Sequence, residues 1–159
     1  MMMSGHILVA TGGYLIFKEY TYDGQWFPDL SFAYEFVLVL FGCLLPDIDT
    51  PDSTVGKRLK FLSIPLTIIF GHRGIFHSLL ACVGIIYLSY TFQYAWLMFI
   101  AGGYLLHLVG DYLTPSGIPL MYPSKKRYRF PIVTDTNSIS EKIVSFGILS
   151  AGIYYALIV

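Results

Sequence analysis

The sequence has 159 residues, of which 55% are hydrophobic and 13% are charged, and its formal net charge is zero. Soluble domains carry about 25% charged residues, and the apolar residues here gather in long runs, which argues against a soluble enzyme. The zero net charge gives no reason to expect nucleic acid as a partner. We expect one all-α, polytopic membrane domain over residues 1–159.

Five apolar segments are predicted to form transmembrane helices. They cover residues 5–17, 31–45, 75–90, 94–113 and 143–159. A sixth segment, residues 61–70, is shorter than the about 20 residues of a span and contains Pro65. This short segment fits a re-entrant or interfacial helix, so we predict a helical bundle with five membrane crossings.

The basic residues test this arrangement, because the segments were chosen by hydropathy alone. Of the ten lysines and arginines, only Lys18 falls on one side of the membrane. The other side holds Lys57, Arg58, Lys60, Arg73, Lys125, Lys126, Arg127, Arg129 and Lys142. Short loops rich in Lys and Arg stay in the cytoplasm, so this side is predicted to be cytoplasmic, with the start of the chain there and its end opposite. If residues 61–70 did span, the two basic loops would lie on opposite sides.

The four histidines and four of the acids map to helix ends on the predicted cytoplasmic side. They are His6, Asp47, Asp49, Asp52, His72, His77, His107 and Asp111. An aspartate within the membrane costs about 2.5–3.5 kcal/mol on insertion scales, so such residues tend to be paired and functional. Neutral imidazole and carboxylate are common ligands of zinc and similar ions. The sequence therefore predicts a site for a divalent metal, with zinc as the expected ion.

The last pair of these residues, His107 and Asp111, lies in the predicted helix over residues 94–113. Because they are four residues apart, their side chains lie on one face of that helix. His107 is expected about two turns inside the membrane, with Asp111 one turn nearer the cytoplasmic end. Glycines on the same helix would let another helix or a metal centre approach closely, and they are Gly102, Gly103 and Gly110.

Two short loops hold the remaining candidates. Prolines keep the first loop extended or turned, and on an extended chain Asp47 and Asp49 would point the same way. In the second loop, Gly74 permits a tight turn that puts His77 in the first turn of the next helix, with His72 folded back beside it.

Each of these features also has a simpler interpretation. A histidine at a helix end can be an interfacial residue, the aspartate loop can be a polar turn that caps a helix, and His107 with Asp111 can be a hydrogen-bonded pair. For the whole cluster the alternative is a buried salt-bridge network with Arg73. The basic loop at residues 125–129 either only anchors its side of the chain at anionic headgroups or also binds phosphate near the metal.

Three motifs together resemble a known family. They are Leu-Leu-Pro46-Asp47-Ile-Asp49, His72-Arg73-Gly74-Ile-Phe-His77-Ser78, and Gly103-Tyr-Leu-Leu-His107-Leu-Val-Gly-Asp111-Tyr-Leu-Thr114-Pro115-Ser116-Gly117. They are similar to those of the LexA-regulated, inner-membrane metal-dependent hydrolases of bacteria and archaea. His6 and Pro119-Leu-Met-Tyr-Pro123 fit the same pattern, so the resemblance covers nearly the whole chain. It implies a membrane-bound, metal-dependent hydrolase.

A more distant likeness is to the all-helical group of zinc-dependent phospholipase C and P1 nuclease. Zinc ligands in that group follow the order His, Asp, His and His-x-x-x-Asp, which is matched by His6, Asp47 or Asp49, His72 or His77, and His107 with Asp111. The group continues with further histidines, and its amino-terminal residue ligates zinc. Here no histidine follows His107, and Met1–Gly5 precede His6. The likeness therefore implies a site of one or two ions.

We expect hydrolysis of a phosphoester, in a lipid or a lipid-linked substrate, at the cytoplasmic face of the inner membrane. The metal-ligand candidates are His6, Asp47, Asp49, His72, His77, His107 and Asp111. An aspartate outside the ligand set, Asp49 or Asp52, would act as general base, and Arg73 would hold anionic substrate charge.

The rival hypothesis is a non-catalytic protein, either a metal-binding structural unit or a transporter of metal or protons. A transporter needs ionisable residues near the midplane that can be reached from both faces. The second and fourth predicted helices carry no such residue at mid-depth, apart from Glu35 near the opposite end. This pattern favours a one-sided site.

Overall fold

The structure is a computed structural model that describes residues 1–21, 30–71, 74–119, 121–124 and 126–158. These residues form α1 (Met3–Thr21), α2 (Phe32–Leu44), α3 (Lys60–Phe70), α4 (Leu79–Phe92), α5 (Leu97–Tyr112) and α6 (Ile139–Ile158). They also form the 3-10 helices η1 (Pro46–Asp49) and η2 (Ile75–His77) and the short strands β1 (Ile118–Pro119) and β2 (Arg127–Tyr128). The predicted all-α class is confirmed, and each predicted apolar segment contains a helix.

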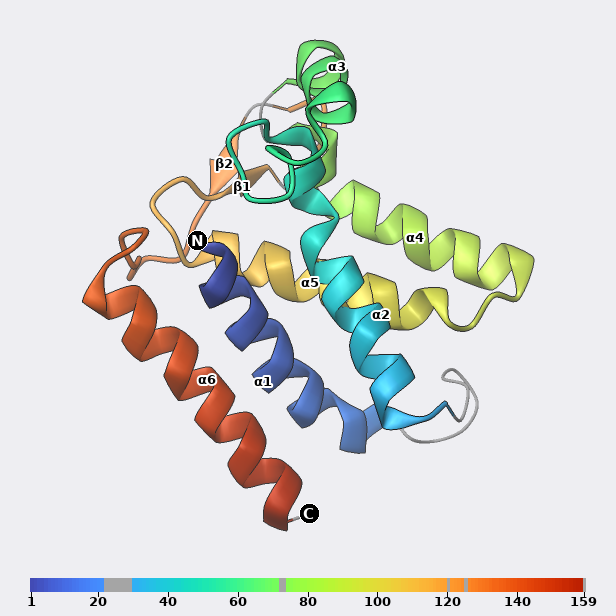
Figure 1. Cartoon of the computed structure of the whole chain (residues 1–159), viewed down its shortest axis with the longest axis vertical. Coiled ribbons are helices and arrows are strands. Elements are labelled where there is room, and N and C mark those ends of the chain that lie inside the picture. The colour runs from blue at the N-terminus through green and yellow to red at the C-terminus, as the bar shows by residue number, and fades with distance from the viewer. Residues whose placement is uncertain (22–29, 72–73, 120, 125, 159) are drawn as a thin grey trace.

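Helix α5 is the central element, and α2, α4 and α1 pack around it (Figure 1). The backbones of α2 and α5 come into direct contact at two glycines. A Cβ at Gly42 would lie 2.1 Å from the carbonyl oxygen of Ile100, and one at Gly103 would lie 1.9 Å from that of Val39. Any larger residue at these two positions would force the helices apart. This contact confirms the expectation that Gly103 lets another helix approach α5 closely.

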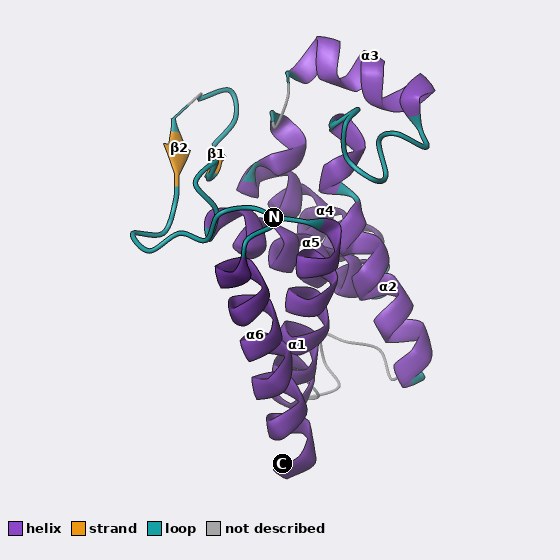
Figure 2. Ribbon diagram, turned by 60° about the vertical axis from the view of Figure 1, so that its left-hand side comes forward, coloured by secondary structure: helices purple, strands orange, loops and turns teal. Residues whose placement is uncertain are grey.

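Helices α1 and α6 run side by side along one edge of the bundle (Figures 1 and 2). A Cβ at Gly152 of α6 would lie 2.4 Å from the carbonyl oxygen of Gly12 in α1. The buried carboxylate of Glu141 joins the starts of the two helices, because it accepts the backbone N–H of Met2 at 2.7 Å and that of Asn137 at 2.6 Å. The beginning of α1 is therefore fixed on the bundle.

Helix α3 lies apart from the other helices, beyond the end of the bundle that holds η1 (Figure 2). Its polar residues face the chain around η1, since the Thr67 hydroxyl donates to the carbonyl of Asp49 at 2.5 Å and that of Ser63 to the carbonyl of Gly56 at 3.1 Å. Its apolar residues Phe61 and Ile68 are each 78% exposed. This amphipathic arrangement is typical of a helix at a membrane surface.

The lengths of the helices bear on how many of them cross a membrane. Among the described residues, only α6, with 20 residues, is long and apolar enough to span by itself. Helices α2, α4 and α5 have 13, 14 and 16 residues, which is fewer than the about 20 that a 30 Å hydrocarbon core requires. The count of five crossings therefore stays a prediction.

The outward faces of these helices are apolar. Val37 and Phe41 of α2 are 60% and 55% exposed, Tyr87 of α4 is 65% exposed, and Leu157 of α6 is 80% exposed. Monomeric soluble proteins rarely expose continuous apolar surface of this kind. Ionisable residues such as His107 and Asp111 lie inside instead, so the arrangement fits a bundle surrounded by lipid.

Candidate metal centre

Six of the residues predicted to form a site come together from four segments of the chain. They are His6 of α1, Asp47 and Asp49 of η1, His77 of η2, and His107 and Asp111 of α5. All except Asp47 are buried. The centre lies at one end of the bundle, where α1 begins, α2 and α5 end, and η2 leads into α4 (Figure 1).

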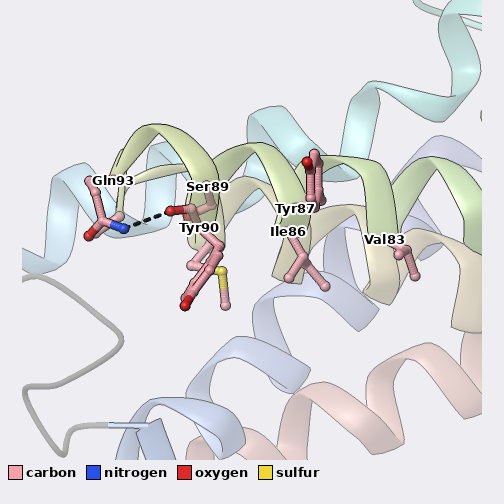
Figure 3. Close-up of a pocket in the computed structure, with 8 residues that line it drawn as sticks. Val83, Ile86, Tyr87, Ser89, Tyr90 and Gln93 are labelled. Atoms are coloured by element: carbon pink, nitrogen blue, oxygen red, sulfur yellow. Dashed lines mark hydrogen bonds between the residues drawn. The ribbon is translucent and has the colours of Figure 1, made fainter.

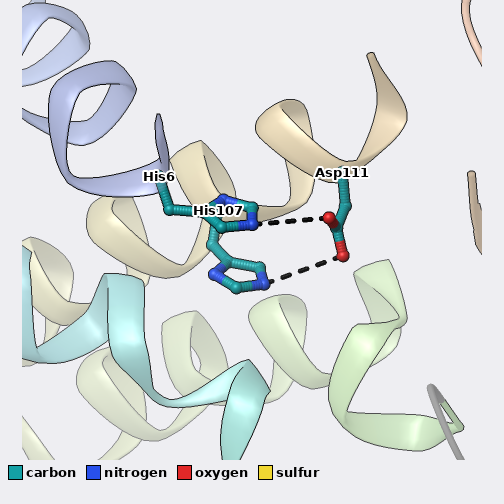
Figure 4. A group of neighbouring side chains, drawn as sticks. All are labelled: His6, His107 and Asp111. Atoms are coloured by element: carbon teal, nitrogen blue, oxygen red, sulfur yellow. Dashed lines mark ion pairs between the residues drawn. The ribbon is translucent and has the colours of Figure 1, made fainter. Parts of the chain in front are cut away.

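Three imidazoles converge on the carboxylate of Asp111. His6 Nε2 lies 3.4 Å from its Oδ1, and its Oδ2 lies 3.6 Å from His77 Nε2 and 3.8 Å from His107 Nε2. Figure 4 shows His6 and His107 pointing at the two carboxylate oxygens. These distances are longer than hydrogen bonds of about 2.7–3.2 Å. Ligand atoms about 2.0–2.1 Å from a tetrahedral zinc ion lie about 3.3 Å from one another, so the spacing fits atoms that share an ion.

Asp47 extends this group on the side of His77. Its Oδ1 lies 4.0 Å from His77 Nε2, and one ligand atom each from Asp47, His77 and His107 lies within 4.8 Å of the other two. The same is true of His6, His107 and Asp111, so His107 belongs to both groups. Burial raises the pKa of Asp47 above its ordinary value, against the opposing effect of His6 and His77. The geometry fits one ion or two neighbouring ions.

Within the described residues, three buried imidazole nitrogens have no hydrogen-bond partner. They are His6 Nδ1, His77 Nε2 and His107 Nε2. Leaving a buried polar atom unsatisfied costs about 1–3 kcal/mol, so natural folds rarely gather several at one point. A cation held by two of these nitrogens, His77 Nε2 and His107 Nε2, would satisfy both.

The second nitrogen of each of these two rings, Nδ1 of His77 and of His107, contacts a polar group of the protein. His107 Nδ1 lies 2.7 Å from the carbonyl oxygen of Cys43, which fixes the hydrogen on Nδ1 and leaves the lone pair on Nε2. His77 Nδ1 lies 3.3 Å from Asp49 Oδ1, and the Thr50 hydroxyl donates to the same oxygen at 3.0 Å. Partners of this kind orient histidine ligands in metal sites.

The two aspartates of η1 do not point the same way, as an extended chain would require. Asp47 faces Nε2 of His77, whereas Asp49 faces Nδ1 of the same ring. The reason is that Pro46 opens a 3-10 helix, in which three residues make one turn and residues two apart face different directions. The expectation of a shared direction was wrong, although both carboxylates reach the centre.

The expected position of His77 in the first turn of a helix was also wrong. His77 ends η2, and Ser78 is extended, with φ −99° and ψ 152°, before α4 begins. Helix α5 holds η2 in place, because the Tyr104 hydroxyl donates to the carbonyl of Phe76. The imidazole thus projects from a short turn fixed against α5.

Two features near His6 complete the centre. Its ring stacks on that of His107 with centroids 3.8 Å apart, and a Cβ at Gly110 would lie 2.8 Å from His6 Nδ1. Gly110 therefore leaves room for this ring, as its position in the sequence suggested. The α-ammonium group of Met1 donates to Asp111 Oδ1 at 2.8 Å and forms an ion pair with it. No side-chain motif pointed to Met1, because the contact is made by its α-ammonium group.

The remaining candidates are not part of the centre described so far. Asp52 is exposed beyond the end of η1. His72, Arg73 and Lys125 lie outside the described residues. The other basic residues of the loop at 126–129 are exposed, next to the end of α5, where the Arg129 guanidinium donates to the carbonyl of Pro115 at 3.3 Å.

The known proteins that this chain resembles include inner membrane proteins. A family model described as YdjM inner membrane protein matches residues 1–158. Inner membrane protein YdjM of Escherichia coli (strain K12) is 45% identical over 98 residues, which cover 57% of this chain and 50% of that protein, and the Shigella flexneri protein of the same name matches equally. Uncharacterized protein YvsG of Bacillus subtilis (strain 168) is 36% identical over 119 residues, 72% of each chain. The matched region spans about half the length of the first two relatives, and no solved structure matches.

Proposed function

The chain belongs to the YdjM inner membrane protein family, and we propose that it is a membrane-bound, metal-dependent hydrolase that cleaves a phosphoester. The observation that carries this proposal is the pair of buried nitrogens His77 Nε2 and His107 Nε2, which have no hydrogen-bond partner and each lie within 4 Å of the Asp111 carboxylate. The resemblance of the three sequence motifs to those of inner-membrane metal-dependent hydrolases supports hydrolysis as the reaction class.

The proposed ligands of the ion are His6, Asp47, His77, His107 and Asp111. A bound divalent ion, with zinc favoured by the nitrogen and oxygen donors, supplies an acidified water molecule and polarises a phosphoryl oxygen. The order of these ligands along the chain also follows that of the zinc-dependent phospholipase C and P1 nuclease group, and this likeness is a hypothesis that supports phosphoesters as the substrate class.

The carboxylates of the η1 region are proposed to have separate roles. Asp49 is a positioning residue, because its buried side chain faces the Nδ1 of His77 and not the convergent nitrogens. Asp52 is exposed and remains the candidate general base. Arg73 and the exposed Arg127 and Arg129 remain candidates for holding the anionic substrate.

The proposed location of the centre is the cytoplasmic membrane face, with five crossings and α3 at the interface. The apolar outward faces of α2, α4 and α6 and the exposed apolar residues of α3 support this arrangement. The concentration of Lys and Arg in the loops on the same side as the centre supports its cytoplasmic orientation.

This topology predicts which sites a membrane-impermeant maleimide can label in spheroplasts. Thr54→Cys and Ser124→Cys, both at exposed positions in loops on the centre's side, should be labelled only after permeabilisation. Thr91→Cys, at the exposed end of α4, should be labelled without it, because the turn between α4 and α5 faces outward. If Thr54→Cys and Ser124→Cys react on opposite sides, α3 spans the membrane and the five-crossing scheme is wrong.

A second prediction concerns the metal itself. Protein purified in detergent without chelators should retain at least one equivalent of a divalent transition metal, because the buried nitrogens make a preformed ligand set. Elemental analysis is the measurement. Less than about a tenth of an equivalent of any transition metal would reject the metal centre.

The same preparation distinguishes the hydrolase from its rivals, which are a non-catalytic metal-binding protein and a transporter. In vesicles that contain phosphatidic acid and phosphatidylglycerol, release of phosphate or headgroup should require the metal, stop with a chelator and return with added zinc. Full metal content without any hydrolysis would support the non-catalytic rival. The core of described residues beside the centre is apolar and includes Ala10, Leu38 and Val39, which speaks against transport.

A further inference from the structure

An apolar cavity of about 210 Å³ lies between α1, α2, α4 and α5. Its wall includes Val39, Cys82 and Phe99 from three different helices, and all three are buried. On α5 its lining reaches Leu106, which directly precedes His107 in the sequence. A cavity with so few polar atoms is suited to a hydrocarbon ligand.

The residues that line the cavity are spread along α1 and α5. On α1 its wall includes Tyr14 and Lys18, which are about 12 and 18 Å along the helix axis from His6 at 1.5 Å per residue. On α5 it reaches Met98, about 14 Å along the axis from His107. The lining of α5 thus extends from the turn that holds His107 to a level about two to three turns away from it.

A wider hollow of about 730 Å³ is lined mainly by residues of α4 (Figure 3). Ile86 and Met98 line both spaces. The hollow also has Val83 and Tyr87 in its wall, and these are 51% and 65% exposed. The cavity therefore borders the surface of the bundle that faces lipid in an inner-membrane protein.

A buried polar cluster bounds the end of the cavity that is distant from the metal centre. The Tyr14 hydroxyl donates to Glu35 Oε2 at 2.5 Å, and Lys18 Nζ lies 3.3 Å from the same oxygen. Glu35 is only 3% exposed. An alkyl chain gains nothing by displacing an ion pair, so this cluster would limit how far such a chain extends.

We propose that the cavity is an acyl-chain site, which holds one hydrocarbon tail of a bilayer lipid whose headgroup lies at the metal centre. The inference rests on the proposed function for the headgroup and names lipid as the substrate class. Its apolar wall fits a hydrocarbon, its lining on α5 runs from Leu106, next to His107 in the sequence, to Met98, and it shares Ile86 and Met98 with the lipid-facing hollow. A folded protein partner cannot enter a space of about 210 Å³ between helices.

Gly102 offers a direct test, because it lines the cavity and a Cβ there would have no neighbouring atom within 4 Å. Gly102→Phe should fill the cavity without a backbone clash. Gly84 in α4 is the matched control, since its Cβ would also meet nothing within 4 Å and it lines neither space. Metal content and a monodisperse size profile should be the same for both variants and the natural protein.

The probe is phosphatidic acid with a photoactivatable diazirine in its acyl chain, placed in phosphatidylglycerol vesicles with the full chain. After irradiation, peptide mapping should find adducts at residues 98–106 and at Cys82 in the natural protein and in Gly84→Phe, and these should be lost in Gly102→Phe. If adducts form only at outward residues such as Val83 and Tyr87, equally in all three proteins, the lipid merely surrounds the bundle and the inference is wrong.

This mapping needs no enzymatic turnover, so the two proposals can fail separately. Cavity adducts in a protein that hydrolyses nothing would support the acyl-chain site and contradict the hydrolase. Hydrolysis that is unchanged in Gly102→Phe, for long-tailed and short-tailed phosphatidic acid alike, would contradict the acyl-chain site and leave the hydrolase standing. Should Gly102→Phe not fold, the adduct map of the natural protein alone decides between the cavity and the outer surface.

Discussion

His107→Ala and Asp111→Asn should each weaken metal binding by a factor of about 100 or more. The binding free energy of zinc at structural sites is about 10–16 kcal/mol, or about 3 kcal/mol for each of four or five ligands. Since about 1.4 kcal/mol is a factor of ten in affinity, the loss of one ligand weakens binding about 100-fold. Asp111 has the largest expected effect, because three imidazoles converge on its carboxylate. The measurement is competition with a chromophoric zinc chelator, together with elemental analysis.

Asp111→Asn retains the size of the side chain, so a loss of metal in this variant does not arise from a cavity in the core. The control is Lys126→Ala, whose exposed ammonium lies outside the centre and should leave metal affinity unchanged. If both His107→Ala and Asp111→Asn keep full metal while remaining monodisperse, the pair has a structural role. The case for an enzyme would then no longer hold.

Asp49→Asn should weaken metal affinity by about 10–100-fold without removing a ligand, as expected when the partner behind a histidine ligand is changed. Asp49 is fully buried, and its two oxygens lie 3.3 and 3.4 Å from His77 Nδ1. An amide holds that nitrogen less firmly than a carboxylate does, so the ring would be less well oriented toward the ion. The same chelator competition measures the change.

Asp52→Asn is the matched comparison, because it makes the same chemical change three residues later at an exposed position. Its metal affinity should equal that of the natural protein, and any hydrolysis should slow if Asp52 is the general base. The reverse result, with metal lost in Asp52→Asn and retained in Asp49→Asn, would exchange the roles assigned to the two aspartates.

Local patterns in the sequence were sufficient for the helices and for part of the site. Runs of apolar residues indicated where each helix lies, since a helix in lipid needs apolar side chains on its outer face. The spacing of His107 and Asp111 indicated a shared face, because helical periodicity depends only on neighbours along the chain. The small size of Gly103 and Gly110 likewise indicated close contacts, and both are found, whereas the same expectation for Gly102 was wrong because a Cβ there would meet nothing within 4 Å. The number of membrane crossings stays a prediction.

The tertiary structure alone decided how the four segments meet. Whether Asp47 or Asp49 faces the convergent nitrogens depends on the turn that Pro46 begins and on the position of His77 in η2, and both depend on contacts with α3 and α5. His107 contacts the backbone carbonyl of Cys43, and Asp111 contacts the α-ammonium group of Met1, so in neither case does a side-chain type reveal the partner. Such contacts join positions far apart in the chain, and only packing of the helices brings them together.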